Sequence, residues 1–137
     1  MSIYNSFSIP SAVTQNANAV LENVDCDPSV TVGDVVRVNS SGIAVKALAD
    51  ALANALVLGV VESKSEPELA TVRLSGISAE GIFSGLADAT QYFLSETTAG
   101  LITPTAPVLS GQVVVKIGQS YGTDRLLVQI GERVLRT

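Results

Sequence analysis

Two hairpin patterns near the C-terminus constrain the fold of this 137-residue chain more than any other feature. The first joins residues 90–95 to residues 101–103 across a turn that contains Gly100. The second joins the β-branched run 112–117, which we expect to end at Gly118, to residues 125–130. Short strands separated by glycine-containing turns are typical of antiparallel sheets, so the sequence predicts an all-β fold.

The same pattern extends through the earlier part of the chain, with strand-like runs recurring about every eight to twelve residues. This spacing is typical of a β-sandwich or barrel and not of a parallel α/β fold. Residues 62–68 are polar and contain Pro67, which predicts a surface loop. The further strands that we expect are residues 20–24, 34–38, 43–47, 55–61, 69–74 and 77–83.

Residues 47–58 can be interpreted in two ways. Leu48, Leu52 and Leu56 recur at the spacing of a helix face, and the segment is rich in alanine. The segment nevertheless lies between strand patterns, which favours a loop with at most one helical turn. We adopt the loop and leave the helix as the alternative.

The sequence thus predicts one antiparallel β-sandwich or β-barrel-like domain over residues 19–137, preceded by an extended N-terminal arm over residues 1–18. The arm is rich in Ser, Asn, Gln and Ala and carries no charged side chain. Tyr4, Phe7 and Ile9 are its apolar anchors, and we expect them to bind a partner or a neighbouring subunit. The alternative is a frayed terminus.

The composition favours assembly. Hydrophobic residues make up 47% of the chain, charged residues only 15%, and the mean hydropathy is +0.40. A water-soluble chain with so few charges often hides part of its surface against other subunits. A monomer with scattered apolar side chains on its surface is the alternative.

Charge and hydropathy also bear on partners. The net charge is −5 and the eight Lys and Arg residues are dispersed, so we expect no nucleic-acid partner. We expect no membrane partner, because no apolar run is long enough to span a bilayer. The N-terminal residues do not resemble a signal peptide, which indicates synthesis in a cytoplasm.

The sequence contains few side chains in patterns that are typical of catalytic or metal sites. It contains no histidine, and its single cysteine, Cys26, lies between Asp25 and Asp27, whose charges oppose thiolate formation. The acidic pairs Asp25 with Asp27 and Glu66 with Glu68 lack the spacing of a calcium loop and the aromatic neighbours of a sugar site. We therefore expect no enzyme activity, no cofactor and no metal.

Several short motifs resemble the β-domains of tailed-bacteriophage virion proteins. The resemblance extends over about residues 30–137 and implies a structural protein without catalytic residues. The motifs are Val-Gly-Asp-Val-Val-Arg-Val at 32–38, Gly-Ile-Ala-Val at 42–45, Leu-Gly-Val-Val at 58–61, Tyr-Phe-Leu-Ser at 92–95, Gly-Leu-Ile-Thr at 100–103, Ser-Gly at 110–111, Val-Val-Val-Lys-Ile-Gly at 113–118 and Leu-Leu-Val at 126–128.

Such domains occur in capsid decoration (cement) proteins and in tail components. A small, acidic, apolar chain with an arm favours decoration of the outer surface of the phage head, with the major capsid protein as partner. The resemblance further implies a homotrimer, since decoration proteins of this sort commonly sit around three-fold positions of a capsid lattice. The alternatives are a tail or tail-fibre accessory protein and a carbohydrate-binding β-domain.

Overall fold

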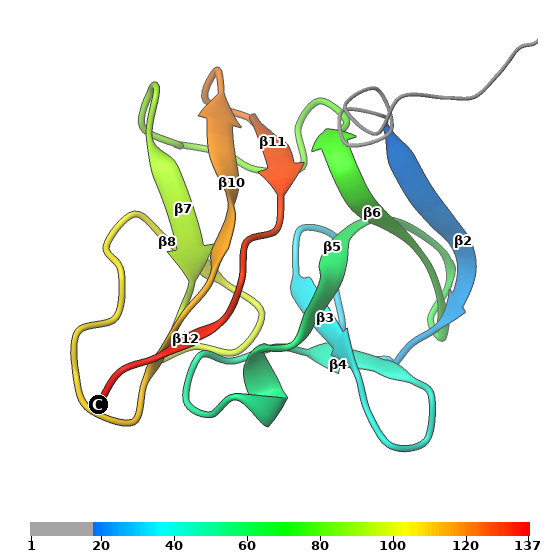
Figure 1. The fold of residues 1–137 in the computed structure, drawn as a ribbon. Coiled ribbons are helices and arrows are strands. Elements are labelled where there is room, and N and C mark those ends of the chain that lie inside the picture. Colours follow the sequence, from blue (N-terminus) through cyan, green and yellow to red (C-terminus); the bar gives the residue numbers. More distant parts are fainter. Residues whose placement is uncertain (1–17) are drawn as a thin grey trace, which may run out of the picture.

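The computed structural model describes residues 18–137, which form an antiparallel sheet curled into a half-barrel (Figure 1). The prediction of an all-β domain is confirmed, and no α-helix occurs in this described part of the chain. The predicted arm, with Tyr4, Phe7 and Ile9, lies outside the described residues except for Asn18.

Eleven strands and one short 3-10 helix make up the described domain. The first hairpin of the sequence pattern is β7 and β8, and the second is β10 and β11. The elements are β2 (Ala19–Asp25), β3 (Val35–Val38), β4 (Ala44–Lys46), η1 (Ala53–Ala55), β5 (Val57–Glu66), β6 (Leu69–Ile77), β7 (Gln91–Leu94), β8 (Ile102–Thr103), β9 (Val113–Val114), β10 (Lys116–Tyr121), β11 (Arg125–Gln129) and β12 (Val134–Leu135).

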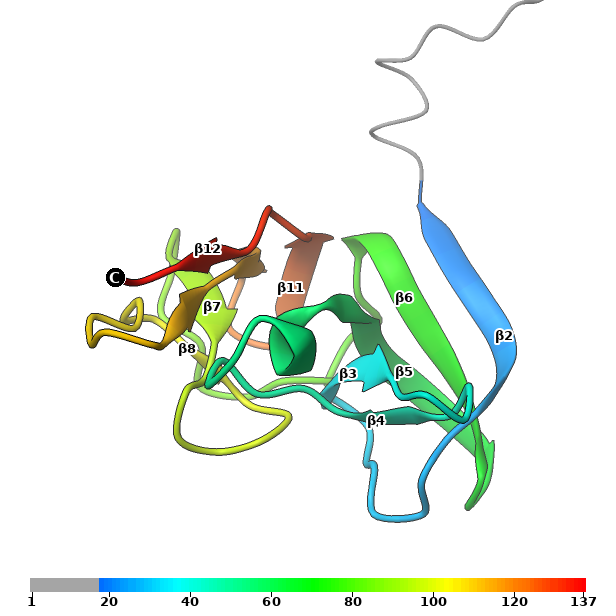
Figure 2. The same cartoon turned by 60° about the horizontal axis from the view of Figure 1, so that its bottom comes forward.

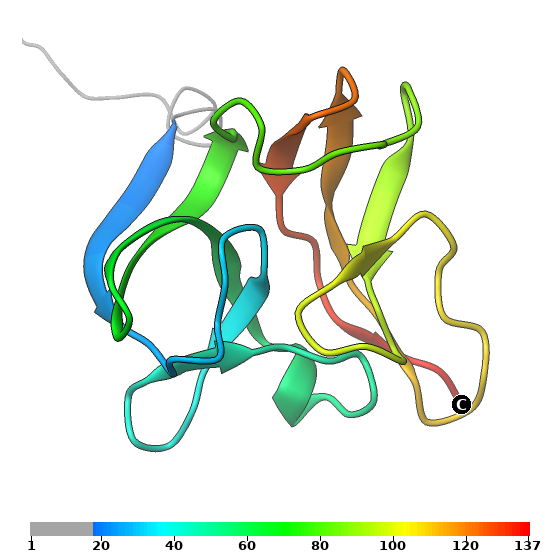
Figure 3. The same ribbon diagram turned by 180° about the vertical axis from the view of Figure 1, so that it is seen from behind.

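Strand β6 connects the two halves of the main sheet. The strand order is β4-β3-β5-β6-β11-β10-β7-β8, and β2 also pairs with β6. Along β6, residues 69–73 pair with β5 and residues 75–77 pair with β11. The segment between β6 and β7 then crosses from one half of the molecule to the other (Figure 3). Strands β9 and β12 form a separate two-stranded sheet.

The core consists of two clusters that share β3 and β5. Val35 and Val60 belong to the larger cluster, whereas the next residues, Val36 and Val61, belong to the smaller one. Because successive side chains of a strand point to opposite faces, these two strands are buried on both faces. The larger cluster contains Leu94, Ile117 and Leu126, and the smaller one is built mainly from valine and alanine.

Two glycines lie where strands approach closely. A Cβ atom on Gly118 would lie 2.1 Å from the Leu127 carbonyl oxygen, and one on Gly59 would lie 2.3 Å from the Arg73 carbonyl oxygen. Gly118 therefore lies inside β10, and the prediction that it ends the strand is wrong. Here glycine permits close strand contact instead of a turn.

Two other predictions about strand ends are also wrong. Residues 62–66 are part of β5 and not of a surface loop, because their backbone pairs with β6 and the chain turns only at Pro67 and Glu68. Conversely, residues 78–83 form turns and bends after β6 ends at Ile77.

Residues 47–58 are a loop with the short helix η1 followed by the start of β5, which confirms the interpretation that we adopted.

Strand β2 is the most exposed long strand of the sheet. Most of its residues are exposed, and its pairing with β6 shifts in register between Leu21 and Val24. Within this irregular stretch Asn23 has a φ of 57°, a left-handed conformation that asparagine tolerates better than most residues. The bulge bends the strand in the middle of an otherwise extended edge.

Candidate functional site

Cys26 and Asp34 are buried and engaged by neighbouring groups. Cys26 is 3% exposed, and its Sγ lies 3.7 Å from the Pro67 carbonyl oxygen, which is the geometry of a packed side chain. Asp34 is also buried, but its Oδ2 accepts hydrogen bonds from the amide and the hydroxyl of Thr31 and lies 3.9 Å from Lys46 Nζ. Within residues 18–137 there is no group of three or more His, Cys, Asp and Glu side chains suited to hold a metal ion.

Exposed apolar side chains are instead the most informative feature of the surface. Across residues 18–137, twelve large hydrophobic side chains are exposed by 40% or more. They gather in part around the C-terminal segment, where Val108, Leu109 and Val134 are exposed by 69%, 63% and 57%, and Leu56 is exposed by 60%. A charge-poor surface with so many apolar side chains is typical of a protein that binds another protein.

The C-terminal segment is held in place by backbone pairing and by two arginines. Strand β12 pairs with β9, and Arg136 exchanges backbone hydrogen bonds with Gly111 and Gln112. Arg136 Nε also donates to the Pro107 carbonyl oxygen, at 2.9 Å, which brings the loop after β8 beside β12. Loop and strand together therefore present one surface.

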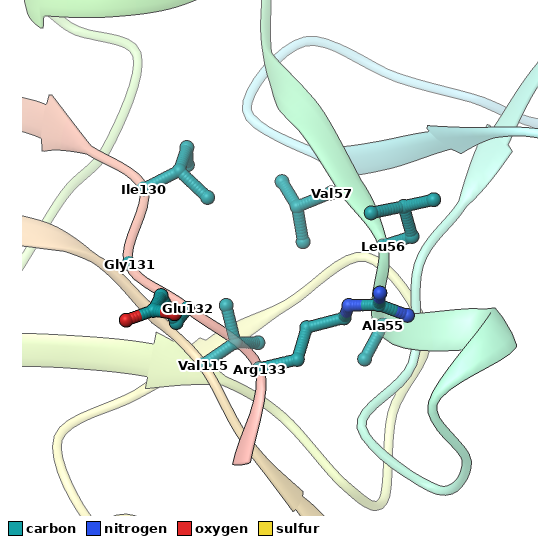
Figure 4. A pocket seen from close by; sticks show the side chains of 8 residues that line it. All are labelled: Ala55, Leu56, Val57, Val115, Ile130, Gly131, Glu132 and Arg133. Carbon is teal, nitrogen blue, oxygen red and sulfur yellow. The ribbon is translucent and has the colours of Figure 1, made fainter.

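Arg133 extends this surface to the loop that holds η1. Its Nη1 donates to the Leu52 carbonyl oxygen, at 2.8 Å. Between these segments lies a cleft of about 290 Å³ with Val57, Val115 and Ile130 in its lining, and Figure 4 shows Arg133 reaching across it toward Ala55. We call the exposed side chains around this cleft and strand β12 the C-terminal face: Leu52, Leu56, Val108, Leu109, Glu132, Arg133, Val134, Leu135 and Arg136.

The opposite side of the molecule is acidic. The acidic pairs of the sequence come together there, because β2 and β5 both pair with β6: Asp25 and Glu66 are each paired with Leu69. The Cys26 amide donates to the Glu68 carbonyl oxygen, which joins the end of β2 to the tip of the β5–β6 hairpin. We call this surface the acidic side: the exposed residues Val20, Leu21, Glu22 and Asp25 of β2, together with Asp27, Glu66 and Glu68.

Few positive groups offset the charge of the acidic side. Lys64 and Lys46 lie close enough for their charges to act on Asp27. Lys64 Nζ also donates to the Val30 carbonyl oxygen, at 2.6 Å, and so fixes the loop after β2. The hydroxyl and the amide of Ser29 donate to Asp27, and these bonds hold the pKa of that carboxyl below its ordinary value of 3.8. Asp27 therefore remains charged at neutral pH. A cavity of about 200 Å³ opens beside these residues, lined by Asp25, Cys26, Ile43 and Glu68.

A third hollow is the largest of the clefts described here, at about 560 Å³. It lies between the loop before β3, the segment between β6 and β7, and the start of β8, and Phe83, Leu86 and Tyr92 contribute to its lining. The Tyr92 hydroxyl accepts a hydrogen bond from the Ala87 amide, which fixes its position in the lining. The more exposed Tyr121 carries the Arg125 guanidinium 5.0 Å above its ring centre, so this ring face does not offer a stacking platform.

Sequence reasoning placed the candidate binding residues in the arm and missed both surfaces. Tyr4, Phe7 and Ile9 lie outside the described residues, so their role stays a prediction. The acidic pairs were visible in the sequence, but only the pairing of β2 and β5 with β6 brings them to one side. The C-terminal face has no local sequence signal, because Leu52, Leu109 and Leu135 are far apart along the chain.

None of the helices in residues 18–137 is long and apolar enough to cross a membrane. Comparisons with protein-family models, with curated proteins and with solved structures found no match. Function is therefore inferred from the residues and their geometry.

Proposed function

We propose that this chain is a non-enzymatic virion structural protein that binds the outer surface of a tailed-phage head and stabilises it, with the major capsid protein as its partner. The observation that carries the proposal is the surface of residues 18–137, where twelve large hydrophobic side chains are exposed. An apolar surface of this extent is better suited to bind a protein lattice than to remain in water.

The fold is consistent with this role. A curled antiparallel sheet with two apolar clusters is a rigid scaffold, and its exposed side chains lie on several distinct surfaces, among them the C-terminal face and β2. The resemblance of residues 30–137 to virion β-domains supports the same role. A location on the tail is the alternative within this class.

The test is the position of the protein on tailed particles produced by the genome that encodes it, determined by cryo-electron microscopy. We expect density for the domain on the exterior of the head, at positions of local three-fold symmetry. Density confined to the tail would support the alternative location. Particles that lack the protein altogether would contradict both.

The arm provides a second test. Deleting residues 2–18 should change the melting temperature of the free domain by only a few degrees, because the arm has no sequence pattern that would pair it within the sheet. Retention on heads stripped of the wild-type copy should fall sharply, since each buried anchor contributes about 1.5–3 kcal/mol before ordering costs are subtracted. Unchanged retention would remove the arm from the proposal.

A matched pair of variants separates the anchors from the length of the arm. Replacing Tyr4, Phe7 and Ile9 by alanine should reduce retention as strongly as the deletion does. Replacing the polar neighbours Asn5, Ser6 and Ser8 by alanine should leave retention unchanged.

A further inference from the structure

The C-terminal face and the acidic side are complementary in charge and lie apart on the same domain. Figures 1 and 2 place β12 and β2 on opposite sides of the molecule in both views. We propose that the C-terminal face of one copy docks onto the acidic side of a second copy, in a head-to-tail contact.

Charge is the first reason. The C-terminal face carries Arg133 and Arg136 against one carboxylate, Glu132, and in the described part of the chain neither arginine forms an ion pair. Across the molecule, Asp25, Glu66 and Glu68 are exposed and also have no ion-pair partner among residues 18–137. A contact between the two surfaces would pair both sets of charges, and complementary charge both orients an interface and speeds its formation.

The two arginines are also held in place for such a contact. Arg133 is tied to the Leu52 carbonyl oxygen through Nη1, and Arg136 to the Pro107 carbonyl oxygen through Nε. Each of these bonds uses one nitrogen of a guanidinium group that carries three, so nitrogens remain to bind a carboxylate of another copy. Holding the side chain in advance reduces the entropy that is lost on binding.

The acidic side contains a cavity that suits an arginine side chain. The cavity of about 200 Å³ has the exposed acidic residues Asp25 and Glu68 in its lining, together with the apolar residue Ile43. This arrangement suits an arginine, whose planar guanidinium forms paired hydrogen bonds with carboxylates and whose aliphatic stem packs on apolar surface. Arginine is also among the residues that most often dominate binding at protein interfaces.

Apolar contact is the second component. Val134 and Leu135 of β12 are exposed near the two arginines, and Val20 and Leu21 of β2 are exposed near the acidic residues. Successive side chains of a strand point to opposite faces, so docking would remove one side chain of each pair from water together with the charges that flank it. The mixture of apolar centre and charged surroundings is the usual composition of a specific protein interface.

A second copy is the partner that these observations favour, because both complementary surfaces belong to one chain. A contact between two different surfaces leaves one of each free on every dimer, so it continues until a ring closes, or as an open filament where the rotation between copies does not close. A homotrimer is one such closed ring. The contact does not depend on binding to a phage head, so it can be tested on the isolated protein.

Charge reversal provides the test, with the oligomeric state measured by sedimentation velocity over a micromolar concentration range. The wild-type protein should associate, and it should do so less at high salt, where exposed charges are screened. The variant with Arg133→Glu and Arg136→Glu should associate about tenfold more weakly or worse, and so should the variant with Asp25→Lys and Glu68→Lys. Mixing these two variants should restore association, because each then meets a complementary surface.

The control is Asp88→Lys with Glu80→Lys, which raises the net charge by the same amount as Asp25→Lys with Glu68→Lys, on exposed residues outside both surfaces. It should leave association unchanged, and all variants should keep the circular dichroism spectrum of the wild type. Three results would overturn the proposal: a wild type that stays monomeric throughout the range, either reversed variant associating as the wild type does, or a mixture of the two that stays monomeric.

Discussion

The two halves of the domain are stabilised differently. Around β7, β10 and β11, the larger cluster buries Leu94, Ile117 and Leu126 completely. Around β2, β5 and β6, the smaller cluster buries mainly valine and alanine, and a partly buried ion pair joins Glu62 to Arg73. Burial of large apolar side chains thus stabilises one half, whereas the other half combines smaller buried side chains with a hydrogen-bonded ion pair.

This difference indicates which half is easier to disturb. Arg73 donates from Nε and Nη2 to the two oxygens of Glu62, at 2.6 and 3.0 Å, and from Nη1 to the Ser75 carbonyl oxygen. The Ala79 amide donates to Glu62 as well. These bonds fix the end of β6 and the start of the next segment, where the smaller cluster supplies little apolar contact.

The largest effect should come from the glycines at the close strand contacts. In Gly118→Ala and in Gly59→Ala the new Cβ would overlap a backbone oxygen of the neighbouring strand, so the strands must separate. We expect a loss of several kcal/mol in the free energy of unfolding, more than the roughly 1–3 kcal/mol of ordinary overpacking. Chemical denaturation measures it.

Gly42→Ala is the matched control for these two variants. Gly42 has a φ of 78°, but a Cβ there would meet no atom within 4 Å. Its cost should be limited to the strain of a left-handed residue, about 1–2 kcal/mol. Equal losses for Gly42 and Gly118 would contradict the steric explanation.

The next effect compares the two clusters directly. Leu126→Ala should cost about 2–5 kcal/mol, the usual range for a buried leucine. Val72→Ala in the smaller cluster removes fewer atoms and should cost less, within about 3 kcal/mol. Cys26 is buried in the smaller cluster, so its reaction with a thiol reagent reports on opening of that cluster. Val72→Ala should speed this reaction at a temperature where the backbone amides of β10 are still protected from hydrogen exchange.

If both variants speed thiol modification and exchange at β10 by the same factor, the two halves unfold as one unit. In that case the contrast between them lies only in composition and not in local stability.

A smaller effect is expected from the ion pair, and it should depend on pH. The hydrogen bonds from Arg73 hold the pKa of Glu62 below its ordinary value of 4.5. The unfolded chain therefore binds a proton as the pH falls through 4.5 while the native chain does not, so this stabilisation is present above that pH and is lost in acid. Glu62→Gln should cost about 1–3 kcal/mol at neutral pH and less as the pH falls.

Melting curves between neutral pH and acid measure this dependence. Glu80→Gln, which removes the charge of an exposed carboxyl, is the control and should leave the acid dependence of the wild type in place. A Glu62→Gln variant that loses stability in acid as steeply as the wild type would show that other groups carry the dependence.

The smallest effect belongs to Asp27→Asn. The asparagine Oδ1 can still accept from the amide of Ser29, so only the charge is lost from an exposed turn. The pKa of Asp27 is also lowered, and the sign is the same as for Glu62: the contribution is present at neutral pH and lost in acid. The change in melting temperature at neutral pH should be smaller than that of Glu62→Gln.

The parts of the fold that the sequence predicted are those set by local signals. The hairpins β3–β4, β7–β8 and β10–β11 have turn residues within a few positions of their strands. The β5–β6 hairpin was misread because residues 62–66 are polar, although strand pairing needs only the backbone. The close contact at Gly118 depends on Leu127 in the neighbouring strand, so a glycine read from the sequence alone suggested a turn.

The candidate surfaces were less predictable than the strands. Asp25 and Glu66 come to one side because both pair with Leu69, and a shift of register in either strand would separate them. The C-terminal face joins residues more than eighty positions apart, such as Leu52 and Arg133. Pairing between distant strands determines these positions, and no local pattern encodes it.

The bulge in β2 has a consequence for how densely this protein can be packed. Among residues 18–137, β2 pairs only with β6, and a strand edge without a partner is a template on which further chains can add and grow into fibrils. The left-handed backbone at Asn23 and the register shift beside it interrupt that template after a few residues. The irregular edge therefore opposes continuation of the sheet of one copy into the next, while contact between copies through side chains remains open.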